Sequence, residues 1–551
     1  MKSITIKTSL FFILFVLSIF NLNGQTPNWL WAKQTTGNGY SYAQDLTYDE
    51  TNNVYTCGFL KGSVNFDTLS IFSDNQRAYV AKYNPDGLFQ WATTFPSEDN
   101  SFASKIRVDN DNNLIVAGYF HGTLSAGNFT LTTNATDLFL VKISPNGNVM
   151  WAKQSVCTSL TQAIDIEIDD DNNIVVLGHN NVQASFGNFI ATESGMFIVK
   201  YNSDGTPVKL INEYACYPRS MDLTNDKILV SAAIGDTTII GNYTLFPTGY
   251  YTIDPIMGDT IYVMHNDLVF ISYEDYDEVN WIKQATSKVH DFWTYTTVDD
   301  YSNYYICGEI NDTTNFWGTI LYPIGNSSIS YLIKTDPLGN IIWLIYGEPI
   351  VPGGRITFKD LTIHEDFIYL LGYPVGKSSF ANMVVSNNYY IYSTLILQLD
   401  LNGIGIWQIF DSTNTANNNP SGIEIDNLDD IVVCGYFEDT VHFGSNYLYN
   451  LGGQTMYLAK VSSEPISVEE HNYADYEIIK LYPNPTNGYF TLDIPTEKAQ
   501  VSIYSSSGKL IREDPFYTKE SNGFQIHESG LYYVNVIIEN KKYCRKVIVI
   551  E

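Results

Sequence analysis

A segment of about sixty residues recurs along most of this chain, and it constrains the fold more than any other feature. One copy reads "DNDNNLIVAGYF" (109–120) and the next reads "DDDNNIVVLGH" (169–179). Clear copies carry a glycine at the same place, and a weaker copy "TNDKILVSAAI" fills the one gap at 224–234. The glycines are Gly58, Gly118, Gly178, Gly308, Gly372 and Gly435.

Each unit also ends in a similar way, as in "VAKYNPDGLFQWATTF" (80–95) and "LVKISPNGNVMWAKQS" (140–155). The glycine permits a tight turn between two alternating strands, because it tolerates positive φ. A unit therefore predicts four short strands, for example "ASKIRVD", "NLIVAGYF", "LFLVKIS" and "NVMWAKQ". Four such strands fill about forty to sixty residues. Because no helical periodicity accompanies the repeat, we expect an all-β fold, a β-propeller, rather than a helical solenoid.

The two ends of the repeat region predict how the ring closes. Seven copies of the second strand are present, but the last unit stops at "MYLAKVSSEP" (456–465), before its tryptophan strand. The segment "NWLWAKQTT" (28–36) near the N-terminus has the sequence of that missing strand. Supplying it would remove the free sheet edges. We expect a seven-bladed β-propeller over 25–463, closed by N-terminal strand exchange.

The order "D..NN.YV.G" followed by "..K....G...W" resembles the SBBP-type β-propeller repeats of exported bacterial proteins, and the resemblance covers residues 25 to about 463. It implies a fold and no particular activity. The ending D-x-x-G-x-x-x-W is also similar to that of quinoprotein dehydrogenases. Those enzymes typically have eight blades, a longer turn and a calcium-bound cofactor pocket, which this sequence does not offer. We therefore predict no cofactor.

The first residues predict export. Lys2 and Lys7 precede an apolar run from Leu10 to Phe20, and the small residue Gly24 follows. This pattern is typical of a secretory signal peptide, predicted here as 1–24. No later stretch approaches the roughly 20 apolar residues of a membrane-spanning helix. The chain carries 60 acidic and 30 basic residues, a balance that argues against nucleic acid as a partner.

Six cysteines in an exported chain raise the question of disulfides. Three of them, Cys57, Cys307 and Cys434, precede the repeat glycine in different units, where Ala117 and Leu177 stand in others. That pattern predicts small buried hydrophobic residues. A bridge between Cys157 and Cys216 remains an alternative, since the sequence does not fix cysteine connectivity.

The first strand of the unit carries a recurring aspartate, which is the candidate ligand site of the ring. Lys105, Tyr295 and Gly422 replace it in other units. First strands line the axial channel, so a carboxylate cluster there could hold a cation or a basic ligand group. Alternatively, each aspartate accepts hydrogen bonds from the neighbouring blade. The residues concerned are Asp45, Asp165, Asp222 and Asp360.

The "DNDNN" and "DDDNN" turns resemble the start of a calcium loop, with two carboxylates in each. Calcium prefers six to eight oxygen ligands, and EF-type loops have glycine at the sixth position. Here Leu114 and Ile174 occupy that position. Asx turns that close a hairpin explain all copies of the turn together, so we predict no metal site. The calcium candidates are Asp109, Asp111, Asp169 and Asp171.

Motifs for catalysis are otherwise missing from the sequence. The eight histidines show no H-E-x-x-H spacing, and no G-x-S-x-G elbow or P-loop occurs. The abundant tyrosine and tryptophan could form sugar-stacking platforms, although blade packing would require the same residues. The sequence therefore favours a binding or scaffold protein, possessing no identified catalytic residue. An enzyme that acts on glycans or uses a quinone in the channel is the alternative.

The sequence changes after Pro465. An acidic connector (464–478) has no repeat pattern, and none of the nine tryptophans lies beyond residue 479. The segments "YFTLDI" (489–494), "QVSIYSSSGKLIRE" (500–513) and "GLYYVNVIIENKKYCRKVIVI" (530–550) alternate with turn signals. They predict a small C-terminal β-sandwich over 479–551.

In "YPNPTNG", "SIYSSSGKLI", "SGLYYV" and "CRKVIVI", this module resembles the type A sorting domain of the type IX secretion system. The resemblance implies transfer across an outer membrane and processing by a sortase-like peptidase. It implies a protein that is secreted or held at the outer cell surface, where its ligand, a glycan or a protein, is unknown. The implied recognition residues are Pro483, Asn484, Pro485, Gly488, Gly508, Gly530, Tyr532, Lys546 and Val547.

Overall fold

The computed structural model describes most of the chain after residue 26. The described ranges are 27–224, 227–253, 260–264, 266–276, 278–287, 294–323, 328–387, 391–412, 417–450, 453–462, 480–483, 486–494, 498–505, 510–518, 523–527, 530–538 and 541–549. The predicted signal peptide (1–24) and connector (464–478) lie outside them. The chain divides into two compact units, residues 1–463 and 464–551.

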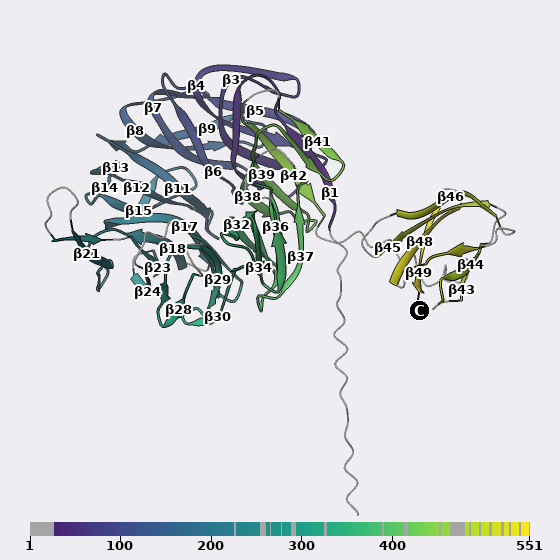
Figure 1. Ribbon diagram of the computed structural model, residues 1–551. Helices are drawn as coiled ribbons and strands as arrows, with labels where there is room; N and C mark the ends of the chain where they lie inside the picture. The colour runs from purple at the N-terminus through teal and green to yellow at the C-terminus, as the bar shows by residue number, and fades with distance from the viewer. Residues whose placement is uncertain are drawn as a thin grey trace, which may run out of the picture. The chain divides into compact units, whose positions relative to one another are not determined.

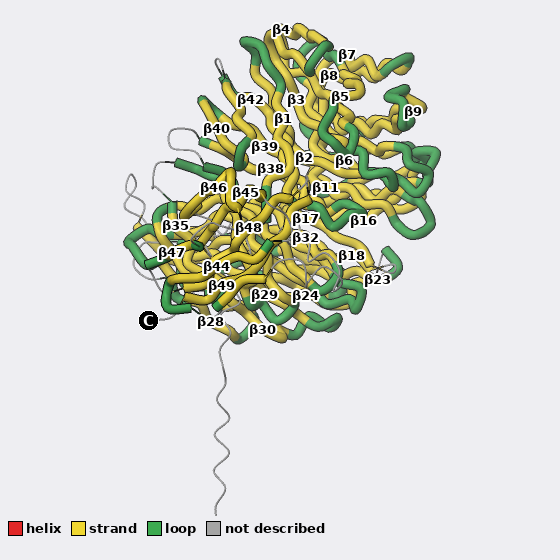
Figure 2. The backbone as a smooth tube through the Cα atoms, turned by 90° about the vertical axis from the view of Figure 1, so that its right-hand side faces the viewer, coloured by secondary structure: helices red, strands yellow, loops and turns green. Residues whose placement is uncertain are grey.

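All regular structure in the described residues is β-strand, as expected from the repeat (Figure 2). Within those ranges we find no helix that is both long and apolar enough to cross a membrane. The described part of the first unit holds seven antiparallel sheets with at least four strands each (Figure 1).

The first three sheets each contain four strands in chain order. They are β2 (Tyr40–Tyr48), β3 (Val54–Phe66), β4 (Leu69–Tyr83) and β5 (Phe89–Phe95); β6 (Ser101–Val108), β7 (Leu114–Ala126), β8 (Phe129–Ile143) and β9 (Val149–Gln154); and β11 (Thr161–Ile168), β12 (Ile174–Asn180), β15 (Gly195–Tyr201) and β16 (Pro207–Tyr214).

The fourth sheet has two additional short strands. It consists of β17 (Cys216–Thr224), β18 (Lys227–Ile234), β23 (Asp267–Glu274), β24 (Glu278–Ser287), β27 (Thr314–Phe316) and β28 (Thr319–Leu321). The next two sheets are β25 (Thr294–Val298), β26 (Tyr304–Ile310), β29 (Ile329–Thr335) and β30 (Ile341–Tyr346); and β32 (Arg355–His364), β33 (Phe367–Val375), β36 (Leu395–Asp400) and β37 (Gly405–Phe410). The last comprises β38 (Asn418–Ile425), β39 (Ile431–Phe437), β42 (Thr455–Val461) and β1 (Trp29–Gln34).

Short strands form additional sheets of two or three strands each. They are β10 (Val156–Cys157) with β13 (Ala184–Phe186) and β14 (Phe189–Ala191), β19 (Thr238–Ile240) with β20 (Tyr243–Leu245), β21 (Gly249–Ile253) with β22 (Thr260–Met264), β31 (Glu348–Pro349) with β34 (Lys377–Phe380) and β35 (Met383–Ser386), and β40 (Thr440–Phe443) with β41 (Asn446–Tyr449). The pair β21–β22 lies between β18 and β23, the second and third strands of the fourth sheet.

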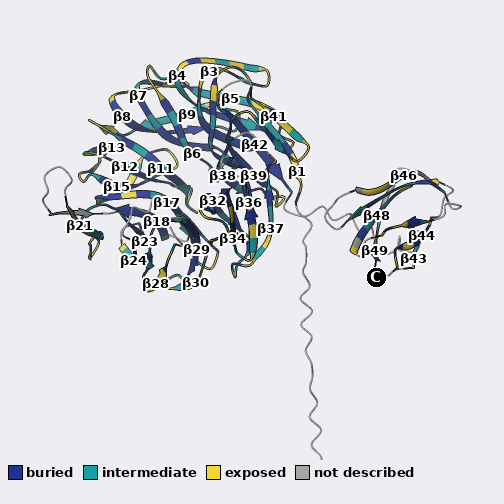
Figure 3. Ribbon diagram, viewed as in Figure 1, coloured by how far each residue is buried: buried dark blue, intermediate teal, exposed yellow. Residues whose placement is uncertain are grey.

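The first strand of each sheet contacts the first strand of the next sheet, and β38 contacts β2. The core is divided in the same way, as the buried strands of Figure 3 show: seven hydrophobic clusters each combine residues from two neighbouring sheets. Tyr55 and Cys57 of β3, for example, pack with Ala103 and Ile106 of β6. Each sheet packs against a neighbouring sheet on both of its faces. The second and third strands therefore bury residues on both sides, which explains why their sequences are almost continuously apolar.

The N-terminal strand β1 pairs antiparallel with β42, the third strand of the last sheet. Its two tryptophans enter different cores: Trp29 packs with residues of β33 and β39, and Trp31 packs with residues of β3 and β4. The Trp31 indole N–H donates to the carbonyl of Pro85, in the turn between β4 and β5. Strand β1 therefore connects the last sheet to the first.

The same indole contact recurs between other neighbouring sheets and explains the G-x-x-x-W spacing. Trp91 of β5 donates its indole N–H to the carbonyl of Pro145, in the next sheet. Gly147, two residues further on, has φ of 85°, and a Cβ there would lie 3.0 Å from the Trp91 ring. The glycine of the G-x-x-x-W motif thus permits the turn and also leaves room for the tryptophan of the preceding sheet. Where the third unit lacks tryptophan, Lys209 donates instead to the carbonyl of Asp275.

The second unit contains two antiparallel sheets that share one hydrophobic core. One sheet is β43 (Lys480–Tyr482), β44 (Tyr489–Asp493) and β47 (Phe524–Gln525), and the other is β46 (Leu510–Thr518), β45 (Lys498–Ser505), β48 (Gly530–Ile538) and β49 (Lys541–Val549). Phe490 and Leu492 of the first sheet pack with Val501 and Val534 of the second. The arrangement agrees with the sandwich expected from the sequence.

Cysteines Cys57, Cys307 and Cys434 are buried and free, each in a different hydrophobic cluster. Cys157 and Cys216 are also free, so the alternative of a bridge between them is wrong. The side chain of Cys544 lies outside the described residues.

Candidate functional site

The first strands of the sheets line one cavity of about 590 Å³ in the first unit. Six of these seven strands contain a β-bulge at the same place, where two residues oppose one on the second strand. A bulge of this kind re-aims side chains and is common next to binding sites. The extra residue varies among the six strands, with serine in two of them: Gln44, Ser104, Ile164, Arg219, Lys359 and Ser421.

Strand register sorts the other residues of the first strands into two levels. The upper level consists of residues paired with the position before the repeat glycine: Asp45, Lys105, Asp165, Ser220, Tyr295, Asp360 and Gly422. The lower level lies two residues further along each strand: Thr47, Arg107, Glu167, Asp222, Thr297, Thr362 and Glu424.

Asp222 therefore does not hold the place equivalent to Asp45, Asp165 and Asp360, and that prediction from the sequence is wrong. In β17 the equivalent residue is Ser220, which pairs with Ser231, whereas Asp222 pairs with Leu229. The strand runs further here, because Thr224 pairs with Lys227 at the place where β2 has already ended in the Asp49 turn. The sequence Asp-Leu-Thr begins at Asp45, Asp222 and Asp360, but in β17 its pairing with the second strand is shifted by two residues.

The upper-level aspartates also hold neighbouring sheets together. Asp45 accepts the backbone N–H of Ile106, and Asp165 accepts that of Met221, at 3.0 Å in both cases. Asp360 accepts the N–H of Ile423 in the same way. Ser220 makes the equivalent bond, because its hydroxyl oxygen accepts the N–H of Thr296. At the lower level, Asp222 accepts the N–H of Val298. The alternative predicted from the repeat, an aspartate bonded to the next blade, is thus observed.

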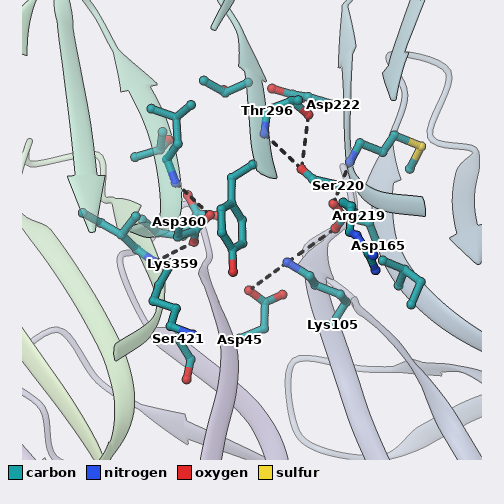
Figure 4. Close-up of a pocket in the computed structure, with 18 of the residues that line it drawn as sticks. Asp45, Lys105, Asp165, Arg219, Ser220, Asp222, Thr296, Lys359, Asp360 and Ser421 are labelled. Atoms are coloured by element: carbon teal, nitrogen blue, oxygen red, sulfur yellow. Dashed lines mark hydrogen bonds and ion pairs between the residues drawn. The ribbon is translucent and has the colours of Figure 1, made fainter. Parts of the chain in front are cut away.

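Two cations from β6 enter the cavity, and the sequence reasoning missed both as site residues. The Lys105 ammonium lies 3.8 Å from Asp45 and 3.5 Å from Asp165, as Figure 4 shows. Below it, the Arg107 guanidinium lies 3.0 Å from Asp45 and 2.8 Å from Glu167. A second cavity of about 360 Å³ shares Arg107, Glu167 and Glu424 with the first, so these three side chains separate the two cavities.

Three carboxyl groups on other strands of the cavity have no such cation. Asp222, Asp360 and Glu424 form no ion pair with any lysine or arginine in the described ranges. Burial is the main cause that raises the pKa of Asp222 to about 7 and that of Asp360 to about 6. Burial also raises the pKa of Glu424 to about 8; Arg107 opposes this effect, whereas Asp45, Asp360 and Glu167 add to it.

The raised pKa of Glu424 predicts a measurable pH dependence of stability. The folded chain holds a proton there up to about pH 8, whereas an unfolded glutamate releases it near pH ~4.3. The stability contributed by this proton is complete below the unfolded pKa and is lost as the pH rises through the folded pKa. We expect Glu424→Gln to raise the melting temperature at pH 8.5 by about 2 °C or more and to change little at pH 5.

Thermal unfolding of the parent chain and the Glu424→Gln variant at pH 5 and pH 8.5 checks this prediction. The exposed Asp86, changed to Asn, is the control and should leave both melting temperatures unchanged. A Glu424→Gln chain that melts no higher than the parent at pH 8.5 would contradict the assignment.

A second set of charges closes the turns between the first and second strands. In five units the turn aspartate pairs with a lysine of the third strand; Lys142 and Asp109, for example, lie 2.6 Å apart. The other pairs are Lys82–Asp49, Lys200–Asp169, Lys334–Asp299 and Lys460–Asp426. The remaining two units lack both partners. Thr224 and His364 occupy the aspartate position in these units, and Ser272 and Gln398 occupy the lysine position. The joint loss of the two residues is visible in the sequence itself.

These pairs bear directly on the calcium candidates. Asp109 accepts the backbone N–H groups of Asp111 and Asn113, as an Asx turn requires. Its charge is balanced by Lys142, and Lys200 lies 2.7 Å from Asp169 in the next unit. Asp111 and Asp171 are exposed. The geometry favours the Asx-turn interpretation over calcium.

Among the described residues, one further group of side chains that could hold a metal ion lies in the turns after β32 and β38. The ligand atoms of His364, Glu365 and Asp429 lie within 4.8 Å of one another. His364 and Asp429 are 2.7 Å apart, and together they link two neighbouring turns. Elsewhere Asn112 makes this link by accepting the backbone N–H of Glu50. The group is therefore a variant of the contact between turns.

The predicted sorting residues are distributed across the second unit. Tyr532 and Val547 are buried in its core. Gly488 has φ of 103°, and a Cβ there would meet the Ile526 carbonyl oxygen at 2.4 Å, so only glycine fits. Pro483 follows β43, and Gly530 begins β48. Asn484, Pro485, Gly508 and the side chain of Lys546 lie outside the described residues.

Comparison with known families identifies part of this unit. Residues 480–550 match the family model of the secretion system C-terminal sorting domain. The match confirms the resemblance predicted for the C-terminal segment, and it indicates export by type IX secretion.

Comparisons of the first unit are more distant. An uncharacterized WD repeat-containing protein of Acanthamoeba polyphaga mimivirus is 32% identical over 111 residues, which is 19% of this chain and 8% of that protein. The chain therefore spans less than a tenth of that relative. Because WD repeats are propeller repeats, the match favours a repeat propeller for this part of the chain.

Among solved structures, an apocarotenoid oxygenase of Synechocystis aligns with a TM-score of 0.34 and 11% identity, over 67% of this chain and 71% of that one. A gluconolactonase of Xanthomonas campestris aligns with a TM-score of 0.28 and 12% identity, over 61% of this chain and 95% of that one. At such values neither similarity carries an argument about the fold or the activity of this chain.

Proposed function

We propose that this chain is an exported binding protein with two separate working parts. A signal peptide (1–24) leads the chain out of the cytoplasm, and the C-terminal unit (479–551) directs it across the outer membrane. The partners of that unit are the type IX secretion machinery and a sortase-like peptidase. The first unit (25–463) then binds a ligand outside the cell or at its surface.

The observation that carries this proposal is the match of residues 480–550 to the sorting-domain family. The matched residues lie in a compact unit of their own, which suits a segment that is recognised apart from the protein it delivers.

For the first unit we propose a seven-bladed propeller of SBBP type, closed by β1. The pairing of β1 with β42 supports this closure, and so does the contact of Trp31 with the turn of the first sheet. The contacts between successive first strands, which return from β38 to β2, support a closed ring.

We further propose that the cavity along the first strands is the ligand site. Its volume of about 590 Å³ is in the range of small-molecule sites. The bulges support this, because the extra residue varies among the six strands and five kinds of side chain occupy it. Pure ring packing would need no such variety.

Transfer of the C-terminal unit to another protein tests the export function. Residues 464–551, fused behind a periplasmic reporter enzyme, should deliver the reporter to the medium or cell surface of a bacterium with type IX secretion. The same fusion in a strain without that machinery, and the reporter alone, should stay in the periplasm. Equal reporter activity outside the cell in all three cases would refute the export function.

A further inference from the structure

The last sheet of the first unit contains a buried lysine that contacts two carboxyl groups. The ammonium group of Lys460, on β42, lies 2.6 Å from Asp426 Oδ2 and 3.0 Å from Asp430 Oδ2. The Asp426 side chain is fully buried, that of Lys460 is 3% exposed and that of Asp430 is 18% exposed. Asp426 and Asp430 begin and end the turn between β38 and β39, so the three side chains join this turn to the third strand of the sheet.

The equivalent turns of other units show what is unusual here. Four of them pair a turn aspartate with a lysine in the same way, but the residue four positions after that aspartate is asparagine. Asp430 replaces the asparagine in the last sheet, and an ionised carboxylate cannot donate a hydrogen bond to Asp426. Lys460 therefore lies between two acids, whereas the other four aspartates each accept an amide N–H from the asparagine: Asn53, Asn113, Asn173 and Asn303.

One ammonium group cannot balance two carboxylates, and the two acids differ in how well they hold a negative charge. Asp426 Oδ1 accepts the backbone N–H groups of Leu428 and Asp430, and its Oδ2 accepts a hydrogen bond from Lys460. Burial is the main cause that raises the pKa of Asp430; the charges of Asp426 and Asp429 add to this effect, and Lys460 opposes it. Asp430 is therefore the acid that more readily keeps a proton.

A carboxylic acid and an amine that are held together in a buried site can form an amide. The contact at Oδ2 keeps Lys460 Nζ beside the carbon of the same carboxyl group, Asp430 Cγ, and such fixed proximity replaces the encounter of two separate reactants. Asp426 lies where it can take a proton from the ammonium group, which makes the lysine nitrogen a nucleophile.

The atoms of this reaction balance without any further reactant. A bond forms between Lys460 Nζ and Asp430 Cγ, and the bond from Cγ to the hydroxyl oxygen of the acid breaks. That oxygen leaves as water, with the proton of the acid and one proton of the lysine. A second lysine proton moves to Asp426, and the third stays on the amide nitrogen. A buried ion pair, which is costly to remove from water, is thereby replaced by a neutral amide and a neutral acid.

We propose that Lys460 and Asp430 form an isopeptide bond in the folded chain, with Asp426 as the proton acceptor. The bond ties β42 to the turn before β39, in the sheet that β1 completes. Asn427 of the same turn donates its backbone N–H to Asn52 of the first sheet, so the cross-link lies where the last sheet meets the first. A cross-link of this kind stabilises a fold by restricting the unfolded chain. The inference does not involve the proposed ligand site and stands or falls separately from it.

The intact mass of the denatured mature chain (25–551) tests the proposal. We expect this mass to be lower than that of the sequence by one water molecule. Trypsin should leave the chain uncut after Lys460, and fragmentation of the digest should identify one branched peptide in which Lys460 is joined to Asp430. A mass equal to that of the sequence would overturn the inference, and so would a water lost elsewhere, for example in a succinimide, without the branched peptide.

Variants test the role of each acid. Asp430→Asn recreates the residue of the four other units, and Asp426→Asn removes the proton acceptor, so neither variant should yield the branched peptide. The exposed Asp86→Asn should yield as much as the parent. Melting curves show whether each variant is folded, and the parent mass decides whether the bond exists even if one variant does not fold. Parental yields of the branched peptide in the folded Asp430→Asn or Asp426→Asn chain would refute the mechanism.

Discussion

In a chain without residues 25–34, the first unit will unfold at a much lower temperature than it does in the intact mature chain. These residues contain β1, which pairs along β42 and places Trp29 and Trp31 in two different hydrophobic cores. Without β1, the edge of β42 is free and both cores lose a large side chain. The single change Trp31→Ala should already cost about 3–5 kcal/mol, a common value for a buried tryptophan.

A neighbouring residue in the same strand provides the control. Leu30 is 46% exposed, so Leu30→Ala should change the free energy of unfolding by less than about 0.5 kcal/mol. A synthetic peptide of residues 25–36, added to the shortened chain, should restore part of the lost stability by pairing with β42. A shortened chain that melts at the parent temperature would show that β1 does not close the ring.

Replacement of Lys142 by methionine will destabilise the first unit by about 3–5 kcal/mol, the typical cost of breaking a buried ion pair on one side. Lys142 and Asp109 are 2.6 Å apart, and their side chains are 6% and 2% exposed. The substitution keeps most of the side-chain volume but leaves Asp109 buried without its cation. Chemical denaturation followed by tryptophan fluorescence measures the loss.

The chain itself supplies the matched control for this prediction. The fourth unit has Thr224 and Ser272 at the two positions of the pair. The double change Asp109→Thr with Lys142→Ser should therefore be less destabilising than Lys142→Met alone, because it leaves no unbalanced charge. If Lys142→Met were as stable as the parent, the pair would contribute nothing to the fold.

The repeat made the strand order predictable. Most units have a glycine turn or a tryptophan strand of their own, and alternation within the strands identifies them without any long-range information. Strands of the described first unit follow this order sheet by sheet. The level of a side chain in the channel was harder to predict, because it depends on the length of the hairpin that follows. Asp222 shows this: its "DLT" matches that of Asp45, yet the shorter turn after it shifts its pairing by two residues.

The charges of the channel could be predicted only where they repeat. Asp45, Asp165 and Asp360 are recognisable in the sequence because they recur at one position of the repeat. Lys105 and Arg107 each occur once, so the repeat gives no sign that they belong to the site. Glu424 gave no signal, because its unit has Gly422 at the upper level and nothing in the sequence shows that the strand brings it beside Arg107. Contacts between strands far apart in the chain decide these cases, and a local pattern does not contain them.

The central claim is that the C-terminal unit carries the address while the first unit carries the binding function. A chain that ends at residue 463 tests it most directly, expressed with its signal peptide in a bacterium with type IX secretion. We predict that this chain accumulates in the periplasm and that its melting temperature there equals that of the first unit in the intact protein. Surface and medium levels equal to those of the full-length protein would contradict the claim.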